Sequence, residues 1–198
     1  MTTIEQAQAS SAPAAGAAAP WRTRDILVAA VIGVVFGVVF AAWNQVYAFF
    51  GFIQPPVLQD WVYGMWLVPA VLAPVIIRKP GAALFAEMVA AGVSALLGSQ
   101  WGPDTLLSGF VQGAAAELVF AMVGYRRWSL PVLSVAAVAS ALGAFVHDWA
   151  LYYSGVAADV QVLRLALMAV SAIGFAAFGS LAIERSLRKA GVLREPAG

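Results

Sequence analysis

Three carboxylates stand inside long apolar stretches of the sequence: Glu87, Glu117 and Asp148. A carboxylate in an apolar span is costly in a membrane, so it normally faces the protein interior and often marks a functional site. Gly113 and Gly109 precede Glu117 at intervals of four residues, which places bare backbone on the carboxylate's side of a helix. This spacing predicts room for a ligand beside Glu117. The alternative is a close helix contact in which a neighbouring hydroxyl or amide bonds Glu117.

Asp148 has polar neighbours that could share a site with it. Tyr152 follows on the same helix face at i+4, and His147 is the adjacent residue. We predict that Asp148 contacts a ligand, the alternative being an ion pair with Arg164. His147 is predicted either to join this site or to be a hydrogen-bonded structural residue. Glu87 is expected to line the base of a cavity or to hydrogen-bond between helices.

Metal and cofactor chemistry is not expected. The chain has one histidine and no cysteine, so it lacks the clustered ligands that a metal site needs. It also lacks a Walker A sequence, a GxSxG sequence and an HExxH sequence. Few groups remain for proton transfer or nucleophilic attack, so we predict that the protein is not an enzyme.

Aromatic residues accompany these carboxylates. An interfacial aromatic belt would explain part of the set without any ligand. Aromatic faces beside carboxylates also suit a flat, cationic, partly apolar ligand, through stacking and cation–π attraction. Two amides add hydrogen-bonding groups that could read the edge of a ring. The predicted binding residues that complete the set are Trp43, Tyr47, Tyr63, Trp66 and Trp101, with the amides Asn44 and Gln112.

The elements that position these residues are transmembrane helices. Of the 198 residues, 62% are hydrophobic and 11% are charged, and the mean hydropathy is +0.85. A soluble domain carries about 25% charged residues, so we predict an all-α membrane protein with its bulk in lipid. The net charge of +1 gives no reason to expect a nucleic-acid partner. Six stretches are long enough to span a bilayer: approximately Asp25–Phe50, Trp61–Ile77, Gly81–Gly98, Thr105–Tyr125, Leu130–Tyr152 and Leu163–Ile183. A kink is expected in the second, at Pro69 and Pro74.

The cations predict how the bundle is oriented. Ten of the eleven Lys and Arg residues fall on one side of a six-span arrangement, and only Arg164 falls on the other. The positive-inside rule makes that side cytoplasmic, so both termini are predicted to lie inside and the protein to be multi-pass in the plasma membrane. The predicted organisation is a disordered tail (1–20), a six-helix transmembrane domain (21–190) and a flexible tail (191–198).

A stripe of small residues marks the first predicted span. Ala29, Gly33, Gly37 and Ala41 recur every four residues, and such a stripe lets another helix approach closely. The partner helix could belong to a separate membrane subunit or to this chain. With the basic turn at Arg78 and Lys79, the stripe is predicted as a docking surface, intramolecular packing being the alternative.

Several sequence runs resemble a known family. They are Tyr63-Gly64-Met65-Trp66, Ile77-Arg78-Lys79-Pro80-Gly81-Ala82-Ala83 followed by Glu87, Val111-Gln112-Gly113 with Ala116-Glu117, and Ser129-Leu130-Pro131-Val132-Leu133. In this order they resemble the YkoE branch of the substrate-binding subunits (S-components) of energy-coupling-factor (ECF) transporters, over about residues 22–193. The positions Tyr63, Trp66, Glu87, Gln112, Glu117 and Asp148 match the motifs of that family.

The resemblance implies a subunit that captures thiamine or its hydroxymethylpyrimidine precursor from outside. It also implies a transmembrane coupling subunit and two cytoplasmic ATPase subunits as partners. Combined with the residue chemistry, it predicts Glu117 and Asp148 as anionic groups, and Trp66 and Trp101 as stacking faces. Two other classes of function stay open: a structural membrane subunit without a small-molecule site, and a self-sufficient ion-coupled carrier.

Overall fold

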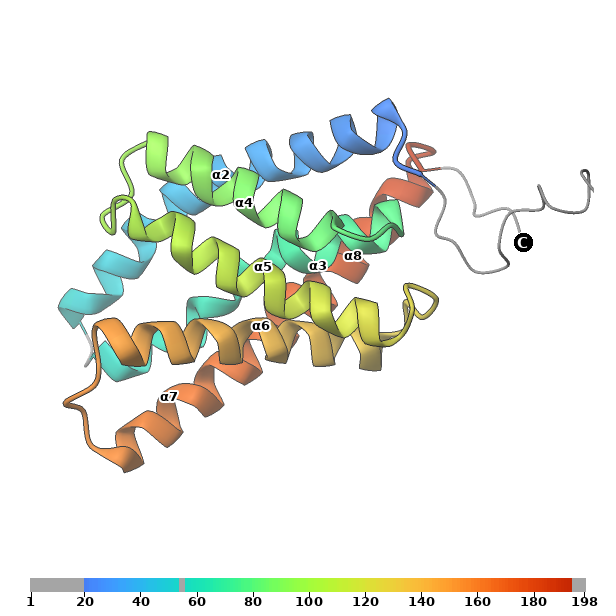
Figure 1. The fold of residues 1–198 in the computed structure, drawn as a ribbon. Coiled ribbons are helices and arrows are strands. Elements are labelled where there is room, and N and C mark those ends of the chain that lie inside the picture. Colours follow the sequence, from blue (N-terminus) through green and yellow to red (C-terminus); the bar gives the residue numbers. More distant parts are fainter. Residues whose placement is uncertain (1–19, 54–55, 194–198) are drawn as a thin grey trace, which may run out of the picture.

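The computed structural model describes residues 20–53 and 56–193. The predicted N-terminal tail before residue 20, and residues 194–198 of the predicted C-terminal tail, lie outside the described residues. Within the described part every regular element is helical, and no strand occurs. In chain order the elements are α2 (Thr23–Ile53), η1 (Pro56–Leu67), α3 (Val68–Ile77), α4 (Ala82–Leu96), α5 (Asp104–Met122), α6 (Leu130–Leu151), α7 (Ala158–Ser171), η2 (Ala172–Phe178) and α8 (Gly179–Lys189) (Figure 1).

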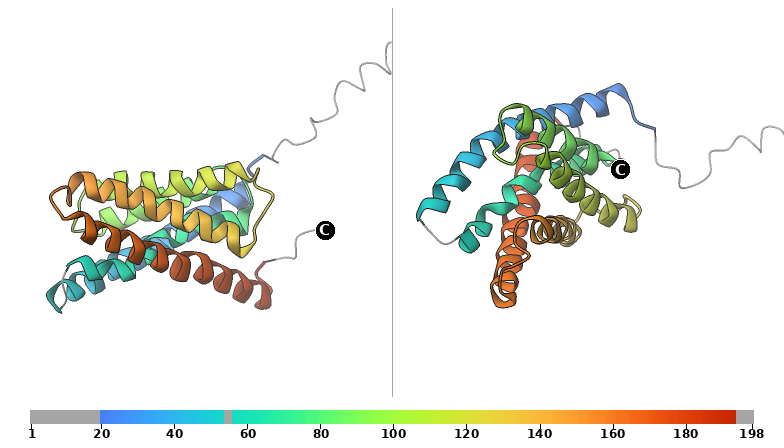
Figure 2. Two further views of the ribbon diagram at one scale, coloured as in Figure 1. Left: turned by 90° about the horizontal axis from the view of Figure 1, so that it is seen from below. Right: turned by 60° about the vertical axis from the view of Figure 1, so that its left-hand side comes forward.

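These elements group into the six apolar segments expected from the sequence. Five of them are long and apolar enough to cross a membrane, and the sixth, α4, has 15 residues. The last span is longer than predicted, because α7, η2 and α8 form one helical rod from Ala158 to Lys189 (Figure 2). The middle of that rod, η2, is wound as a π-helix. The all-α bundle is therefore confirmed.

The second span lies at the centre of the bundle and changes its winding. It starts as the 3₁₀-helix η1 and continues from Val68 as α3, most of whose residues are buried. Pro69 occupies the first turn of α3, where its missing N–H removes no helical hydrogen bond. The helix type changes just before Pro69, which is one of the two prolines where the sequence predicts a kink. Pro74 lies inside α3.

One glycine lets this central span contact the last one. A Cβ atom on Gly64 would lie 2.2 Å from the carbonyl oxygen of Ser171. The Gly64 N–H donates to the Ser171 hydroxyl at 2.8 Å. Such an approach of η1 to the end of α7 is possible only without a side chain at position 64.

The small-residue stripe of α2 packs against α4 of the same chain. A Cβ on Gly33 would lie 2.6 Å from Val89 Cβ, and one on Gly37 would lie 2.4 Å from Val93 Cβ. Ala29, one turn earlier, is fully buried. The predicted docking role of this stripe, from Ala29 to Ala41, is therefore corrected: its close helix partner is intramolecular, because α4 already fills the groove.

The bundle has two distinct ends (Figure 1). The start of α2, the α3–α4 connection, the α5–α6 connection and the end of α8 lie together, and we call this the basic end because it carries the cationic segments. Lys79 pairs with Asp25 at 2.5 Å, and the Arg78 guanidinium lies 6.0 Å above the Trp128 ring. The α4–α5 and α6–α7 connections lie at the opposite end, which we call the cavity end.

Candidate functional site

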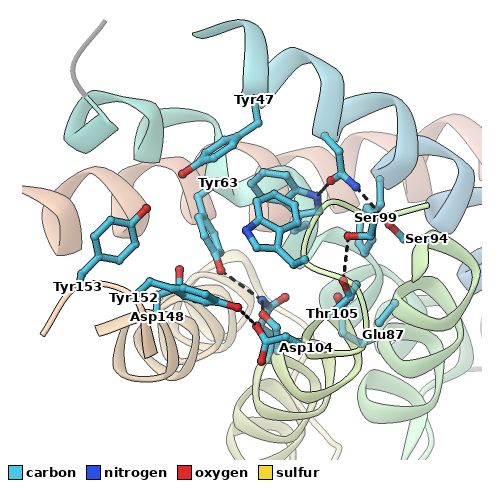
Figure 3. Close-up of a pocket in the computed structure, with 18 residues that line it drawn as sticks. Tyr47, Tyr63, Glu87, Ser94, Ser99, Asp104, Thr105, Asp148, Tyr152 and Tyr153 are labelled. Carbon is cyan, nitrogen blue, oxygen red and sulfur yellow. Dashed lines mark hydrogen bonds between the residues drawn. The ribbon is translucent and has the colours of Figure 1, made fainter. Parts of the chain in front are cut away.

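A cavity of about 310 Å³ lies toward the cavity end, between α2, η1, α4, α5 and α6 (Figure 3). This volume falls in the range of small-molecule pockets. The aromatic residues that line it are Phe40, Tyr47, Tyr63, Trp66, Trp101, Tyr152 and Tyr153. The polar residues that line it are Asn44, Glu87, Ser94, Ser99, Asp104, Thr105, Ser108, Gln112 and Asp148. Nine of the twelve predicted binding residues are among these.

Trp66 is the centre of the aromatic wall. Its ring makes edge contacts with Tyr47, Tyr63 and Trp101, at centroid distances of 5.0, 5.3 and 5.6 Å. Its indole N–H donates to the Asn44 side-chain oxygen at 3.1 Å, which fixes the orientation of the ring. Because these rings come from α2, η1 and the α4–α5 connection, the wall forms only in the folded bundle.

The two predicted amides are both held by neighbouring groups. The Asn44 amide nitrogen lies 3.5 Å from the Ser94 hydroxyl, while its oxygen accepts from Trp66. The Gln112 amide nitrogen donates to the Ser108 hydroxyl at 2.6 Å and lies 3.4 Å from the Tyr63 hydroxyl oxygen. The amides therefore present fixed rather than rotating polar groups to the cavity.

Glu87 is a buried carboxyl with a free acceptor. Its side chain is 1% exposed, and its Oε2 accepts a hydrogen bond from the Ala70 backbone N–H at 3.0 Å. No hydrogen-bond donor among the described residues reaches Oε1. A buried acceptor without a partner is costly, and a ligand donor would remove that cost. Both alternatives stated for Glu87 therefore occur, since it lines the cavity and hydrogen-bonds between α4 and α3.

Two further carboxylates meet a histidine beside the cavity. His147 Nδ1 lies 3.0 Å from Asp148 Oδ1, and its Nε2 lies 3.1 Å from Asp104 Oδ1. The Tyr152 hydroxyl donates to Asp104 Oδ2 at 2.6 Å (Figure 3). Partial burial and the hydrogen bond to Asp104 raise the pKa of Tyr152 to about 12. His147 itself is buried behind the two carboxylates and does not line the cavity.

A buried ion pair closes the neighbouring side of the bundle. Arg164 Nε donates to Asp60 Oδ2 at 2.7 Å, and both side chains are almost completely buried. The Arg164 guanidinium also lies 3.6 Å from the centroid of the Tyr153 ring. Arg164 therefore forms its ion pair with Asp60. The alternative stated for Asp148, an ion pair with Arg164, is not found. Asp148 keeps its carboxylate toward the cavity and His147.

Glu117 lies away from the cavity, toward the basic end. Its Oε1 accepts from the Gly81 N–H at 2.6 Å and the Tyr125 hydroxyl at 2.7 Å, and its Oε2 accepts from the Ala83 N–H at 2.9 Å. A carboxylate at the first N–H groups of a helix stabilises that helix end, here the start of α4. Glu117 therefore stabilises a helix contact, as in the alternative given above, and the predicted ligand role of Glu117 is corrected.

The glycines that precede Glu117 have the same explanation. A Cβ on Gly109 would lie 2.6 Å from Ala91 Cβ, and one on Gly113 would lie 3.0 Å from Glu87 Cβ. The backbone groove is therefore filled by α4 over this part of α5. Trp43 also lies outside the cavity lining, since its indole N–H donates to the Val62 carbonyl at 3.1 Å and its ring packs on Phe175.

Sequence reasoning missed several lining residues on α5. Asp104 and Ser108 line the cavity, although neither is among the binding residues predicted from the sequence. Both precede Gln112 at intervals of four, so the three share one helix face. That spacing was the available signal. Asp60 was not predicted as the partner of Arg164, because it stands at the edge of an apolar stretch. Arg164 is the one cation predicted at that end of the bundle, which could have indicated an acidic partner.

The chain is similar to known transport proteins over most of its length. Residues 24–143 match the family described as ABC-type cobalt transport system, permease component. The chain is 36% identical over 176 residues to YkoE of Bacillus subtilis (strain 168), a protein named as an HMP/thiamine permease, and the alignment covers 87% of each chain. A crystal structure of an S-component of an ECF transporter matches it with a TM-score of 0.86 and 33% identity, over 90% of this chain and 91% of that one.

These relatives are transporter subunits, which confirms the prediction that the chain is not an enzyme. The apolar helices and the family together make it a multi-pass protein of the plasma membrane. An S-component works with a membrane-embedded coupling subunit and ATPase subunits in general. The chain belongs to the YkoE-type family of S-components of ECF transporters.

Proposed function

We propose that this S-component binds thiamine or hydroxymethylpyrimidine in the cavity and delivers it for ATP-driven uptake. The observation that carries the proposal is Glu87, which lines the same cavity as Trp66 and whose buried Oε1 has no hydrogen-bond donor among the described residues. An aminopyrimidine ring offers N–H donors on one edge and a flat face for aromatic contacts. The similarity to YkoE, named for HMP and thiamine, supports the same ligand class.

Each part of the ligand has a matching group. The aminopyrimidine would place its donor edge on Glu87 Oε1 and its face against the rings around Trp66. The cationic thiazolium of thiamine would lie toward Asp104 and Asp148, the two aspartates that line the cavity. The free pyrimidine precursor lacks the fixed charge, so it would depend on Glu87 and the rings and little on the two aspartates.

The orientation in the membrane follows from the cations. The basic end would face the cytoplasm under the positive-inside rule, so both ends of the described chain would lie inside. The cavity end would then face outward, where the substrate arrives. The coupling subunit and the two ATPase subunits would approach from the basic end and from the lipid-facing helices.

The test is a binding titration on purified protein in detergent. Thiamine, hydroxymethylpyrimidine and riboflavin would be titrated while the fluorescence of the seven tryptophans is recorded. We expect saturable quenching by thiamine or hydroxymethylpyrimidine and none by riboflavin, because Trp66 and Trp101 line the cavity. A flat response to both proposed ligands in well-folded protein would overturn the substrate assignment and favour a structural subunit.

A further inference from the structure

His147 is enclosed between two carboxylates that come from different helices. Asp104 is the first residue of α5, and Asp148 follows His147 near the end of α6. The two imidazole nitrogens lie 3.1 and 3.0 Å from one oxygen of each carboxylate. The His147 side chain is 5% exposed and is not among the residues that line the cavity, while Asp104 and Asp148 are.

The number of protons on the ring decides whether this arrangement is favourable. A neutral imidazole carries one N–H, so one of its nitrogens would direct a lone pair at a carboxylate oxygen. An imidazolium carries two N–H groups and donates to both carboxylates. Carboxylates in their ionised form only accept hydrogen bonds, so two ionised carboxylates at these distances both receive a hydrogen bond only from the doubly protonated ring.

We propose that His147, as an imidazolium, is a positioning residue that holds Asp104 and Asp148 together as the cation-binding side of the cavity. The inference rests on the proposed function, because it assigns these carboxylates to the positive part of the substrate. One imidazolium between two carboxylates leaves a net charge of −1, which one fixed positive charge on the ligand neutralises. Loss of the ring proton leaves two adjacent carboxylates that repel each other and separate.

The other polar groups around the cluster do not replace this function. Tyr152 donates to Asp104, and with its pKa at about 12 it stays neutral across the physiological range. Two groups from other elements also interact electrostatically with the Asp148 carboxyl: the Tyr63 hydroxyl of η1 and, at longer range, the Arg164 guanidinium of α7. Arg164 is already paired with Asp60. Among the described residues, His147 is therefore the group that contacts a carboxylate of both helices with its two ring nitrogens.

The sequence makes the protonation state directly measurable. His147 is the one histidine of the chain, so its imidazole nitrogens give unambiguous signals in ¹⁵N NMR of the histidine-labelled full chain in micelles. We expect both nitrogens to be protonated in the folded protein without ligand, and thiamine affinity to be about tenfold lower at a pH where the spectrum shows a neutral ring. A neutral ring at about pH 6.5 overturns the proposal, as does an affinity that stays constant through the ring's titration.

The variant His147→Gln separates positioning from general stability. We expect its thiamine affinity at about pH 6.5 to be about tenfold lower than that of wild type, and its pH profile to be flat. The matched control is Asp159→Asn, which changes an exposed charge in the first turn of α7 outside the cavity and should keep the wild-type profile. A wild-type profile in His147→Gln would overturn the positioning role.

The failure of this inference is distinct from a failure of the proposed function. Wild-type protein that binds thiamine with the same affinity at every pH overturns the role of His147 alone. Wild-type protein that binds neither thiamine nor hydroxymethylpyrimidine overturns both. Because the NMR measurement uses wild-type protein without ligand, it decides the protonation state even where His147→Gln does not fold.

Discussion

Glu87 accepts a hydrogen bond from the backbone N–H of Ala70 at 3.0 Å, and this contact joins the cavity floor to the first turn of α3. Near the start of a helix, backbone N–H groups lack helical partners, so an acceptor from α4 satisfies one that would otherwise be buried and unpaired. The same carboxyl therefore secures the centre of the fold with one oxygen, while its other oxygen is buried without a donor among the described residues.

The first prediction concerns Glu87→Gln. A glutamine can keep the bond to Ala70 through its oxygen, but it presents an N–H₂ group where a ligand donor needs an acceptor. We expect the fold to survive and the affinity for hydroxymethylpyrimidine to fall about 10- to 100-fold, as measured by tryptophan quenching. The matched control is Glu117→Gln, the same change outside the cavity, which should leave affinity unchanged. Equal affinities for wild type and Glu87→Gln would remove Glu87 from the site.

The second prediction concerns the stability role of Glu117. Glutamine offers one acceptor oxygen in place of two, so at least one of the bonds from Gly81, Ala83 and Tyr125 is lost. We expect Glu117→Gln to be destabilised by about 1–3 kcal/mol, seen as a lower Tm in detergent. Tyr125→Phe removes only one of these donors and should lower Tm less. A Glu117→Gln protein with the wild-type Tm would contradict this assignment.

The third prediction tests the buried ion pair. Arg164→Met leaves the Asp60 carboxylate buried without its cation, and such a loss costs about 3–5 kcal/mol. We expect Tm to fall sharply in Arg164→Met and to recover in part when Asp60→Asn is added, since no unpaired charge then remains. Thermal unfolding of the wild type, both single variants and the double variant forms the cycle. Additive losses would show that the two side chains are not coupled.

The fourth prediction concerns the contact between α2 and α4. A methyl group on Gly37 would lie 2.4 Å from Val93 Cβ and 2.9 Å from the Ala90 carbonyl oxygen. We expect Gly37→Ala to cost about 1–3 kcal/mol by overpacking and to lower Tm. Gly174→Ala is the matched control, because no side chain or backbone of another described segment lies within 4 Å of its added Cβ. If both variants kept the wild-type Tm, the close packing of these helices would be disproved.

The architecture was readable from the sequence because it depends on local properties. Apolar length identifies spans, and turn residues such as Pro80 and Gly81 separate them. The helix types within the spans could not be predicted from these local properties. The 3₁₀-helix η1 and the π-helix η2 meet at the close approach of Gly64 to Ser171, and such a contact between distant segments leaves no periodic signal.

The site was predictable in its chemistry and less so in its geometry. Depth and aromatic spacing placed Glu87, Trp66 and Asp148 at the cavity, where the structure has them. The ligand role predicted for Glu117 was wrong, because Gly109 and Gly113 are equally compatible with an open groove and with a tight helix contact. Only the position of α4 decides between the two, and that position is a tertiary property.

The shortness of α4 has a consequence for the surrounding lipid. At 1.5 Å per residue its 15 residues rise about 22 Å, whereas the hydrocarbon layer of a bilayer is about 30 Å thick. Its last turns carry Ala91 and Ser94 to the cavity. Such a hydrophobic mismatch is met by local thinning of the bilayer, at a modest cost for each ångström. With the cavity end facing outward as proposed, headgroups and water would reach deeper beside α4 than elsewhere, and acyl-chain length would then change how openly the cavity communicates with the outer solution.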